Sequence, residues 1–288
     1  MKAVIDIGSN TIVLVTYDII DNKPINKETF SYPAHLIDYV ENKTMSKEGI
    51  NLAKTVLLDY KKMCEERSIE DIYCDITEPC RINNKEELEG SLKETGIKIY
   101  PLSGEEEASL DFLGAKLCFE DIHDGVAFDV GGGSTELVSF EDDEILSAIS
   151  IPLGCVRLSH YPLDTEICNQ ELQNIKEANP SLNIHSDTLI GIGGTVRAIS
   201  KLHKDLYGDK KVINVSNLED MFNRLVNKEE KAILSMQENV NKERQHVLLP
   251  GMHMVLEIAH IFNSKEILVS KTGIREGFLL HCLNYSKD

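Results

Sequence analysis

The sequence lacks any C-x-x-C pair, although its 288 residues include seven cysteines. Such pairs are typical of zinc sites, and an even number of cysteines at regular spacing is typical of a disulfide framework. Seven scattered cysteines therefore predict free thiols in a reducing compartment, so we expect a cytoplasmic protein. A chain of this length can also bury a core that needs neither disulfides nor metals to hold it together.

Long apolar runs are missing as well. No segment approaches the about 18 to 20 apolar residues that a membrane-spanning helix requires. The first residues, MKAVIDIGSN, place an aspartate where a signal peptide would have its apolar region. We therefore expect neither membrane insertion nor secretion. The nine histidines form no H-x-x-H or H-E-x-x-H arrangement, so we interpret them as structural or surface residues.

Positive charge is scarce, with 30 Lys and Arg against 48 Asp and Glu and a formal net charge of -18. A field of that sign repels nucleic acid and anionic membranes. An anionic ligand must then be held locally, by backbone N–H groups, by Mg2+ or by a few arginines, whose guanidinium groups bind phosphate oxygens bidentately. Four arginines stand beside glycines or short motifs, with surface salt bridges as their alternative role: Arg81, Arg157, Arg197 and Arg275.

Alternating strand and helix patterns predict an α/β fold. Two or three strands are expected within 2–31, helices over 46–67 and 84–95, a strand over 97–102 and a helix over 104–117. Three further strands are expected within 125–150, helices near 154 and 166, a strand, glycine turn and helix over 188–202, helical structure over 216–262, a strand over 265–270 and a final helix over 273–283.

The strand pattern occurs twice. Asp6 and Gly8 align with Asp129 and Gly131 at a constant offset of 123 residues, and similar strands surround both pairs. An internal duplication explains this repeat better than chance. No linker rich in Pro, Gly or Ser marks a boundary, so the strand pattern alone places the two expected domains at 1–120 and 121–288.

The two repeated turns are candidate phosphate loops. Each begins with an aspartate at a strand end, and the small residues that follow let backbone N–H groups converge on a phosphate while the carboxylate reaches a metal ion. An ordinary hairpin turn is the alternative for the first loop. Three consecutive glycines make the second loop more specific, because they weaken a strand and expose its backbone. The loops are Asp6 with Gly8, Ser9, Asn10 and Thr11, and Asp129 with Gly131, Gly132, Gly133, Ser134 and Thr135.

Two further features point to the same chemistry. Glu136 lies on the strand that leaves the second loop, where it could join the metal shell of Asp129 or remain an exposed strand carboxylate. Gly193 and Gly194 precede a predicted helix, whose N-terminus favours an anion. Such glycine turns are common in α/β folds, but three in one chain favour phosphate binding.

Three glutamates open the helix predicted from residue 104. Ser103 and Glu106 have the spacing of a capping box, and acidic residues suit the first turn of a helix. Capping does not explain Glu107, which lies at the flank of the apolar stripe. Glu107 is therefore our candidate general base.

Six motifs in a fixed order resemble the exopolyphosphatase and guanosine pentaphosphate phosphohydrolase (Ppx/GppA) family, within the actin-like ATPase superfamily. The resemblance covers nearly the whole chain and is closest to the short, two-domain members. It implies two ribonuclease-H-like domains that face each other across a cleft. The motifs are AVIDIGSNT, SGEEEA, FDVGGGSTEL, IPLGCVRL, GIGGTVRAI and GIREG.

The resemblance also implies roles for individual residues. Asp129 and Glu136 match catalytic carboxylates that hold the metal together with Asp6, and Glu107 matches the catalytic glutamate, with Glu106 as the fallback. The metal would be Mg2+, with Mn2+ as an alternative. The implied phosphate contacts are Gly8, Ser9, Asn10, Thr11, Arg81, Gly131, Gly132, Gly133, Ser134, Thr135, Gly193, Gly194 and Arg275.

The implied activity is hydrolysis of a terminal phosphoanhydride in polyphosphate or guanosine pentaphosphate. Family members commonly carry Arg where this chain has Val13 and Ser109, and small residues where it has 77–80. These departures favour a short substrate or slow turnover. An ATP-dependent phosphotransferase and a weakly catalytic sensor of polyphosphate or guanosine tetra- or pentaphosphate stay open, as does a homodimer.

Overall fold

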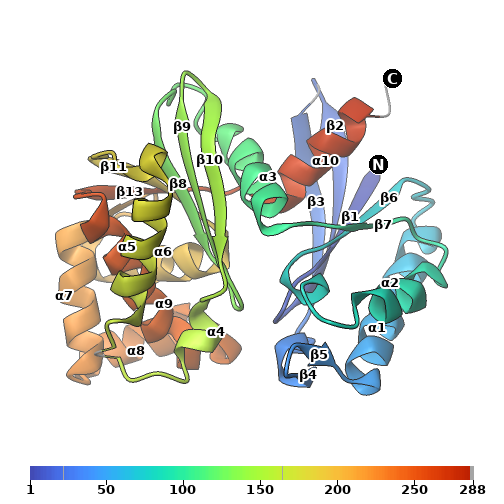
Figure 1. Ribbon diagram of the computed structural model, residues 1–288, viewed down its shortest axis with the longest axis horizontal. Coiled ribbons are helices and arrows are strands. Elements are labelled where there is room, and N and C mark those ends of the chain that lie inside the picture. Colours follow the sequence, from blue (N-terminus) through green and yellow to red (C-terminus); the bar gives the residue numbers. More distant parts are fainter. Residues whose placement is uncertain (22, 164, 286–288) are drawn as a thin grey trace. The chain divides into compact units, whose positions relative to one another are not determined.

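A computed structural model describes residues 1–21, 23–163 and 165–285. The chain divides into two compact units, one formed by Met1–Leu110 with the C-terminal helix α10 (Ile274–Tyr285) and the other by Asp111–Gly273 (Figure 1). This division differs from the expected domains in two respects. Helix α3 (Gly104–Lys116) continues across the boundary, and α10 packs its Phe278 and Leu279 into the core of the first unit.

The first unit contains a five-stranded sheet with the order β3-β2-β1-β6-β7. Strands β1, β2 and β3 pair antiparallel, whereas β6 pairs parallel with β1 and β7 pairs parallel with β6. Their bounds are β1 Lys2–Ile7, β2 Ile12–Ile20, β3 Lys23–Tyr32, β6 Ile72–Ile76 and β7 Ile99–Pro101. Short elements lie beside this sheet: η1 Leu36–Tyr39, β4 Val40–Glu41, β5 Thr44–Met45 and η2 Glu78–Cys80.

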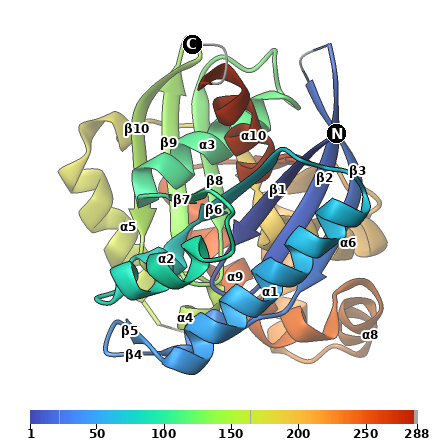
Figure 2. The same ribbon diagram turned by 90° about the vertical axis from the view of Figure 1, so that its right-hand side faces the viewer.

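Successive residues of β1 point to opposite faces of this sheet and enter different cores. Ala3 and Ile5 pack with helices α1 (Lys47–Glu66) and α2 (Lys85–Lys93) (Figure 2). Val4 packs on the other face with α10 and the start of α3. Asp6 shares the face of Val4, so α10 covers the side of the sheet on which that carboxylate lies.

The second unit repeats this topology with the order β10-β9-β8-β11-β13-β12, in which β12 is an additional edge strand. The same pattern of antiparallel and parallel pairs confirms the predicted duplication. The strands are β8 Gly125–Val130, β9 Thr135–Glu141, β10 Glu144–Ile151, β11 Thr188–Ile192, β12 Val212–Asn214 and β13 Glu266–Val269. The helices are α4 Cys155–Leu158, α5 Ile167–Ala178, η3 Pro180–Leu182, α6 Gly193–Tyr207, α7 Val215–Val226, α8 Glu230–Asn239 and α9 Lys242–Ile261.

The expected α/β class is confirmed. The helical stretch predicted over 216–262 consists of three helices, and the sequence patterns missed strands β6 and β12. All seven cysteines are free, and only Cys118 is exposed. Within the described ranges, no helix is both long and apolar enough to cross a lipid bilayer.

Candidate active site

The first predicted loop begins at Asp6, near the end of β1. Across the sheet, Asp6 is in register with Val13 on β2 and with Asp75 on β6. Helix α10 brings Arg275 to the same place, with its Nη1 atom 4.0 Å from Asp6 Oδ2. Arg275, predicted as a phosphate contact, thus forms an ion pair with the first predicted metal ligand.

Asp75 is a buried carboxyl that the sequence patterns missed, because they missed its strand. Its side chain has no solvent exposure, and neither oxygen has a hydrogen-bond partner among the residues that the structure describes. Burial, and then the neighbouring negative charge of Asp6, raise the pKa of Asp75 well above its usual range. A proton on this carboxyl lowers the cost of burying it.

The other neighbour of Arg275 is a buried tyrosine–glutamate pair. The Tyr17 hydroxyl donates a hydrogen bond of 2.7 Å to Glu276 Oε1. Burial, followed by the charge and hydrogen bond of Glu276, raises the pKa of Tyr17, so this hydroxyl stays a donor. The sheet face under α10 therefore holds a polar cluster in which Asp75, Glu276 and Tyr17 are buried and Asp6 and Arg275 are half-buried.

The backbone of the first loop is held by its surroundings. The N–H of Gly8 donates to the carbonyl of Thr11 at 3.2 Å and closes the turn. The carbonyls of Ser9 and Asn10 accept hydrogen bonds from backbone N–H groups within 35–37. Gly8, Asn10 and Thr11 are half-buried and Ser9 is buried, so the loop is preorganised by the fold.

The predicted capping box is confirmed at the start of α3. The N–H of Ser103 donates to Glu106 at 2.8 Å, and the N–H of Glu106 donates to the Ser103 hydroxyl at 3.1 Å. Glu107 instead forms an ion pair with Arg81, which follows β6 and η2. The structure thereby distinguishes the two glutamates: Glu106 caps the helix, and Glu107 lies against a candidate phosphate-binding arginine.

The second unit pairs two predicted carboxylates. Asp129, near the end of β8, is in direct register with Glu136 on β9. Glu136 is buried and accepts a hydrogen bond of 2.7 Å from the Ser150 hydroxyl. Gly193 lies against the same aspartate, since a Cβ atom added there would come within 2.0 Å of Asp129 Oδ1.

The triple-glycine loop is closed by its own backbone and by the segment that leads into α4. The N–H of Gly131 donates to the carbonyl of Ser134 at 2.9 Å. A Cβ atom on Gly154 would lie 2.5 Å from the carbonyl carbon of Gly132, so these backbones are in direct contact. Gly131 and Gly132 are half-buried, whereas Gly133 and Ser134 are buried.

Two threonine hydroxyls support the loops of the second unit. The Thr135 hydroxyl donates to the carbonyl of Leu153 at 2.8 Å, and the Thr195 hydroxyl donates to the carbonyl of Val130 at 2.6 Å. Both threonines are buried. Thr135, predicted as a phosphate contact, therefore uses its hydroxyl proton to hold the fold.

Arg244 is a candidate binding residue that the sequence patterns missed. A Cβ atom on Gly194 would lie 2.2 Å from Arg244 Nη1, so this guanidinium lies directly against the glycine turn. Arg244 belongs to a charged helix start without any motif, and only the approach of α9 reveals it. Arg197, one of the arginines singled out by sequence, instead donates to the carbonyl of Ser270 at 3.4 Å.

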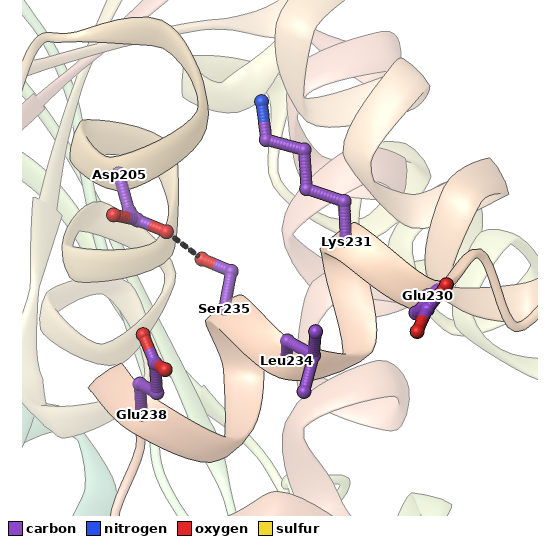
Figure 3. Close-up of a pocket in the computed structure, with 6 residues that line it drawn as sticks. All are labelled: Asp205, Glu230, Lys231, Leu234, Ser235 and Glu238. Carbon is purple, nitrogen blue, oxygen red and sulfur yellow. Dashed lines mark hydrogen bonds between the residues drawn. The ribbon is translucent and has the colours of Figure 1, made fainter.

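A surface pocket of the second unit is distinct from these loops. It is formed by α6 and α8, and the Ser235 hydroxyl donates to Asp205 at its wall (Figure 3). Three carboxylates against one lysine make it unsuited to a phosphate. Its lining residues are Asp205, Glu230, Lys231, Leu234, Ser235 and Glu238.

The carboxylates of the loops fit the way in which Mg2+ is usually held. Across the described ranges, no group of three or more His, Cys, Asp or Glu side chains could hold a metal ion by itself. Mg2+ is commonly bound by one or two carboxylates and completed by waters and substrate phosphates. The in-register pair Asp129 and Glu136 supplies two such oxygen donors.

Two α/β domains with the same sheet order, each with an aspartate before a glycine-containing turn, define the actin-like ATPase fold. The model of the Ppx/GppA phosphatase family matches residues 24–286. The chain therefore belongs to the Ppx/GppA phosphatase family. The cleft between the domains that this fold implies stays a prediction.

Three similar proteins illustrate this membership. The crystal structure of the Aquifex aeolicus member of the Ppx/GppA family has a TM-score of 0.80 and 26% identity, covering 99% of this chain and 98% of that one. A bifunctional 3-dehydroquinate synthase/phosphatase from Fusobacterium nucleatum is 28% identical, over 97% of this chain and 46% of that protein. A guanosine-5'-triphosphate,3'-diphosphate pyrophosphatase from Aliivibrio fischeri is 25% identical, over 96% of this chain and 58% of that protein. The chain thus spans about half the length of these two curated relatives.

Proposed function

We propose that this protein hydrolyses the terminal phosphoanhydride bond of inorganic polyphosphate or guanosine pentaphosphate. The observation that carries the proposal is the pairing of Glu107 with Arg81, which joins a candidate general base to a candidate phosphate ligand within the unit that holds the first loop. Family membership and the Aliivibrio fischeri pyrophosphatase support this class of substrate.

The side chains divide the work of phosphoryl transfer between them. Glu107 accepts the proton of the attacking water on a carboxylate oxygen, and general-base catalysis of this kind is typically worth about 100-fold to 10,000-fold in rate. Arg81 and the N–H groups of Ser9, Asn10 and Thr11 balance the negative charge on the phosphoryl oxygens. We assign the same part to the N–H groups of Gly132, Gly133 and Ser134 in the second loop, since those of Gly8 and Gly131 close the two turns. As the water oxygen bonds to the terminal phosphorus, the bond from that phosphorus to the bridging oxygen breaks, and the substrate shortened by one phosphate leaves with the bridging oxygen. The proton then passes from Glu107 to solvent, and inorganic phosphate is released.

Mg2+ is the proposed cofactor, with Mn2+ as an alternative. Asp6, Asp129 and Glu136 would hold it, and when bound it would neutralise charge on the leaving phosphate. Asp6 is already paired with Arg275, which reduces the negative charge of the first loop. We therefore assign the larger part of the metal binding to Asp129 and Glu136.

Two positions favour short substrates. Val13 is buried in the apolar core under α10, and the Ser109 hydroxyl donates to the carbonyl of Glu105 at 2.7 Å. Neither side chain offers a positive charge to a long polyanion. We therefore expect a lower KM for tripolyphosphate than for long-chain polyphosphate.

One assay tests the proposal and its alternatives. The purified protein is incubated with Mg2+ and tripolyphosphate, long polyphosphate, guanosine pentaphosphate or ATP, and phosphate and ADP are both measured. Release of phosphate from the first three substrates, abolished by EDTA, is the expected result. Formation of ADP only when an acceptor is present would favour a phosphotransferase, and binding without turnover would favour a sensor.

A further inference from the structure

A glutamate lies directly against the first phosphate loop. The Ser9 hydroxyl donates a hydrogen bond of 2.7 Å to Glu78 Oε2. Ser9 is buried and Glu78 is half-buried, so water competes weakly for this contact. A carboxylate thus accepts the hydroxyl proton of Ser9, although the proposed function assigns this loop to the binding of phosphate.

The fold holds Glu78 in this place. Glu78 opens η2 immediately after β6, whose parallel register with β1 extends to the pair Ile7 and Ile76. The N–H of Thr77 then donates to the carbonyl of Ile7 at 3.3 Å. The strand pairing therefore carries Glu78 to the loop that follows β1, and Pro79 restricts the backbone after it.

The chemistry of this contact opposes phosphate binding in two ways. A serine hydroxyl has a single proton, and Ser9 donates it to Glu78, so it can donate to a phosphate only after that charge-assisted hydrogen bond breaks. The carboxylate also adds a negative charge beside a site that must accept a polyanion. Each effect weakens the binding of a highly charged ligand.

The short helix η2 that begins at Glu78 also leads into Arg81, which makes a second contact of the site. Arg81, three residues after Glu78, forms its ion pair with Glu107. The hydroxyl of Ser9 and the guanidinium of Arg81 are thus each bound to a carboxylate of the protein. An incoming phosphate must replace these carboxylates before it can bind either group.

We infer that Glu78 is a specificity-determining residue that competes with the substrate phosphate for Ser9 and selects against highly charged polyanions. This inference rests on the proposed function, because it assumes that the first loop receives a phosphate. It assigns to Glu78 a role in binding, and leaves the proton transfer to Glu107.

The test compares Glu78→Gln with Glu94→Gln. Both substitutions remove one negative charge, but Glu94 pairs with Lys54 on the surface of the first unit, so it controls for the change in net charge. Calorimetry with tripolyphosphate measures binding, and phosphate release measures turnover. Removing a charge a few ångströms from the ligand should tighten binding about tenfold, or about 1.4 kcal/mol, in Glu78→Gln. Glu94→Gln should bind like the parent protein.

A double-mutant cycle separates competition for Ser9 from a general change of charge. The loss of affinity caused by Ser9→Ala should be at least about twofold larger in a Glu78→Ala background than in the parent, because only there is the hydroxyl released. Thermal unfolding confirms that the variants are folded. If Glu78→Ala does not fold, the comparison of Glu78→Gln with Glu94→Gln remains the test.

The outcomes separate this inference from the proposed function. If the parent hydrolyses tripolyphosphate but Glu78→Gln and Glu94→Gln bind it equally, Glu78 is not a competitor and the inference is overturned. An additive cycle overturns the part played by Ser9. If neither the parent protein nor any variant binds or hydrolyses tripolyphosphate or guanosine pentaphosphate, both the inference and the proposed function are overturned.

Discussion

Replacing Gly193 by alanine adds a single methyl group where α6 begins against Asp129. The backbone of Gly193 has φ of 80°, and the added carbon would lie 2.0 Å from Asp129 Oδ1 and 2.1 Å from Oδ2. Such contacts do not occur between real atoms, so the carboxylate or the start of α6 must move by about 1 Å. The substitution therefore displaces the proposed metal ligand without changing its chemistry.

The substitution should lower both the stability and the catalytic rate, and a substitution at a second glycine separates the two effects. An alanine in the left-handed region costs about 1–2 kcal/mol of stability, and a displacement of about 1 Å at a reacting centre can cost about 100-fold in rate. Gly208, at the other end of α6, has φ of 92°, and in the described part of the chain no atom lies within 4 Å of an added Cβ. Gly208→Ala is thus a matched control, because it places an alanine at positive φ without displacing a neighbouring side chain.

The assay is Mg2+-dependent phosphate release together with urea denaturation of both variants. Gly193→Ala should lose at least as much free energy of unfolding as Gly208→Ala, because it adds the clash with Asp129 to the same backbone cost, and only Gly193→Ala should lose about 100-fold in kcat. Equal kcat values for the two variants would refute the reasoning, because contact with Asp129 would then have no catalytic consequence.

Three further predictions address single side chains. Glu107→Gln should lower kcat by about 100-fold to 10,000-fold. Glu106→Gln keeps an oxygen that can accept the Ser103 N–H, so it should leave kcat unchanged and lower stability by about 0.3–1 kcal/mol, through the negative charge lost from the first turn of α3. Phosphate release and thermal unfolding measure both, and the reverse ranking would assign the base to Glu106. Asp75→Asn should raise the free energy of unfolding at pH 7 by about 1–3 kcal/mol. The reason is that the pKa of Asp75 is raised by folding, so the parent protein loses stability as pH rises from the pKa of the unfolded state through that of the folded state. Urea denaturation should show that the free energy of unfolding falls less from pH 4 to pH 7 in the variant than in the parent, and an equal fall would contradict this. Burial lowers the pKa of His253 below 6.5, so the unfolded chain binds more protons, and the free energy of unfolding falls as pH drops below that value. His253→Phe should reduce this fall between pH 7 and pH 5. An identical slope of the free energy of unfolding against pH in variant and parent would count against the prediction.

Local patterns in the sequence were sufficient for the features that depend on neighbouring residues. The capping box of Ser103 and Glu106 was predictable from spacing alone. Since Glu105 suits the first turn of the helix, Glu107 at the flank of the apolar stripe was the glutamate left to explain. The duplicated strand pattern around Asp6 and Asp129 likewise predicted the two equivalent sheets. Propensity, capping and periodicity act over a few residues, so they can be read from the order of the residues along the chain.

Tertiary structure decided the contacts between distant segments. Strand β6 is too short to give a clear alternation, and only its pairing with β1 places Asp75 beside Asp6. The same pairing brings Glu78 to Ser9, which lies 69 positions away in the sequence. The approach of α9 places Arg244 against Gly194. These contacts depend on strand register and on helix packing, which are determined by the burial of whole faces rather than by any local pattern.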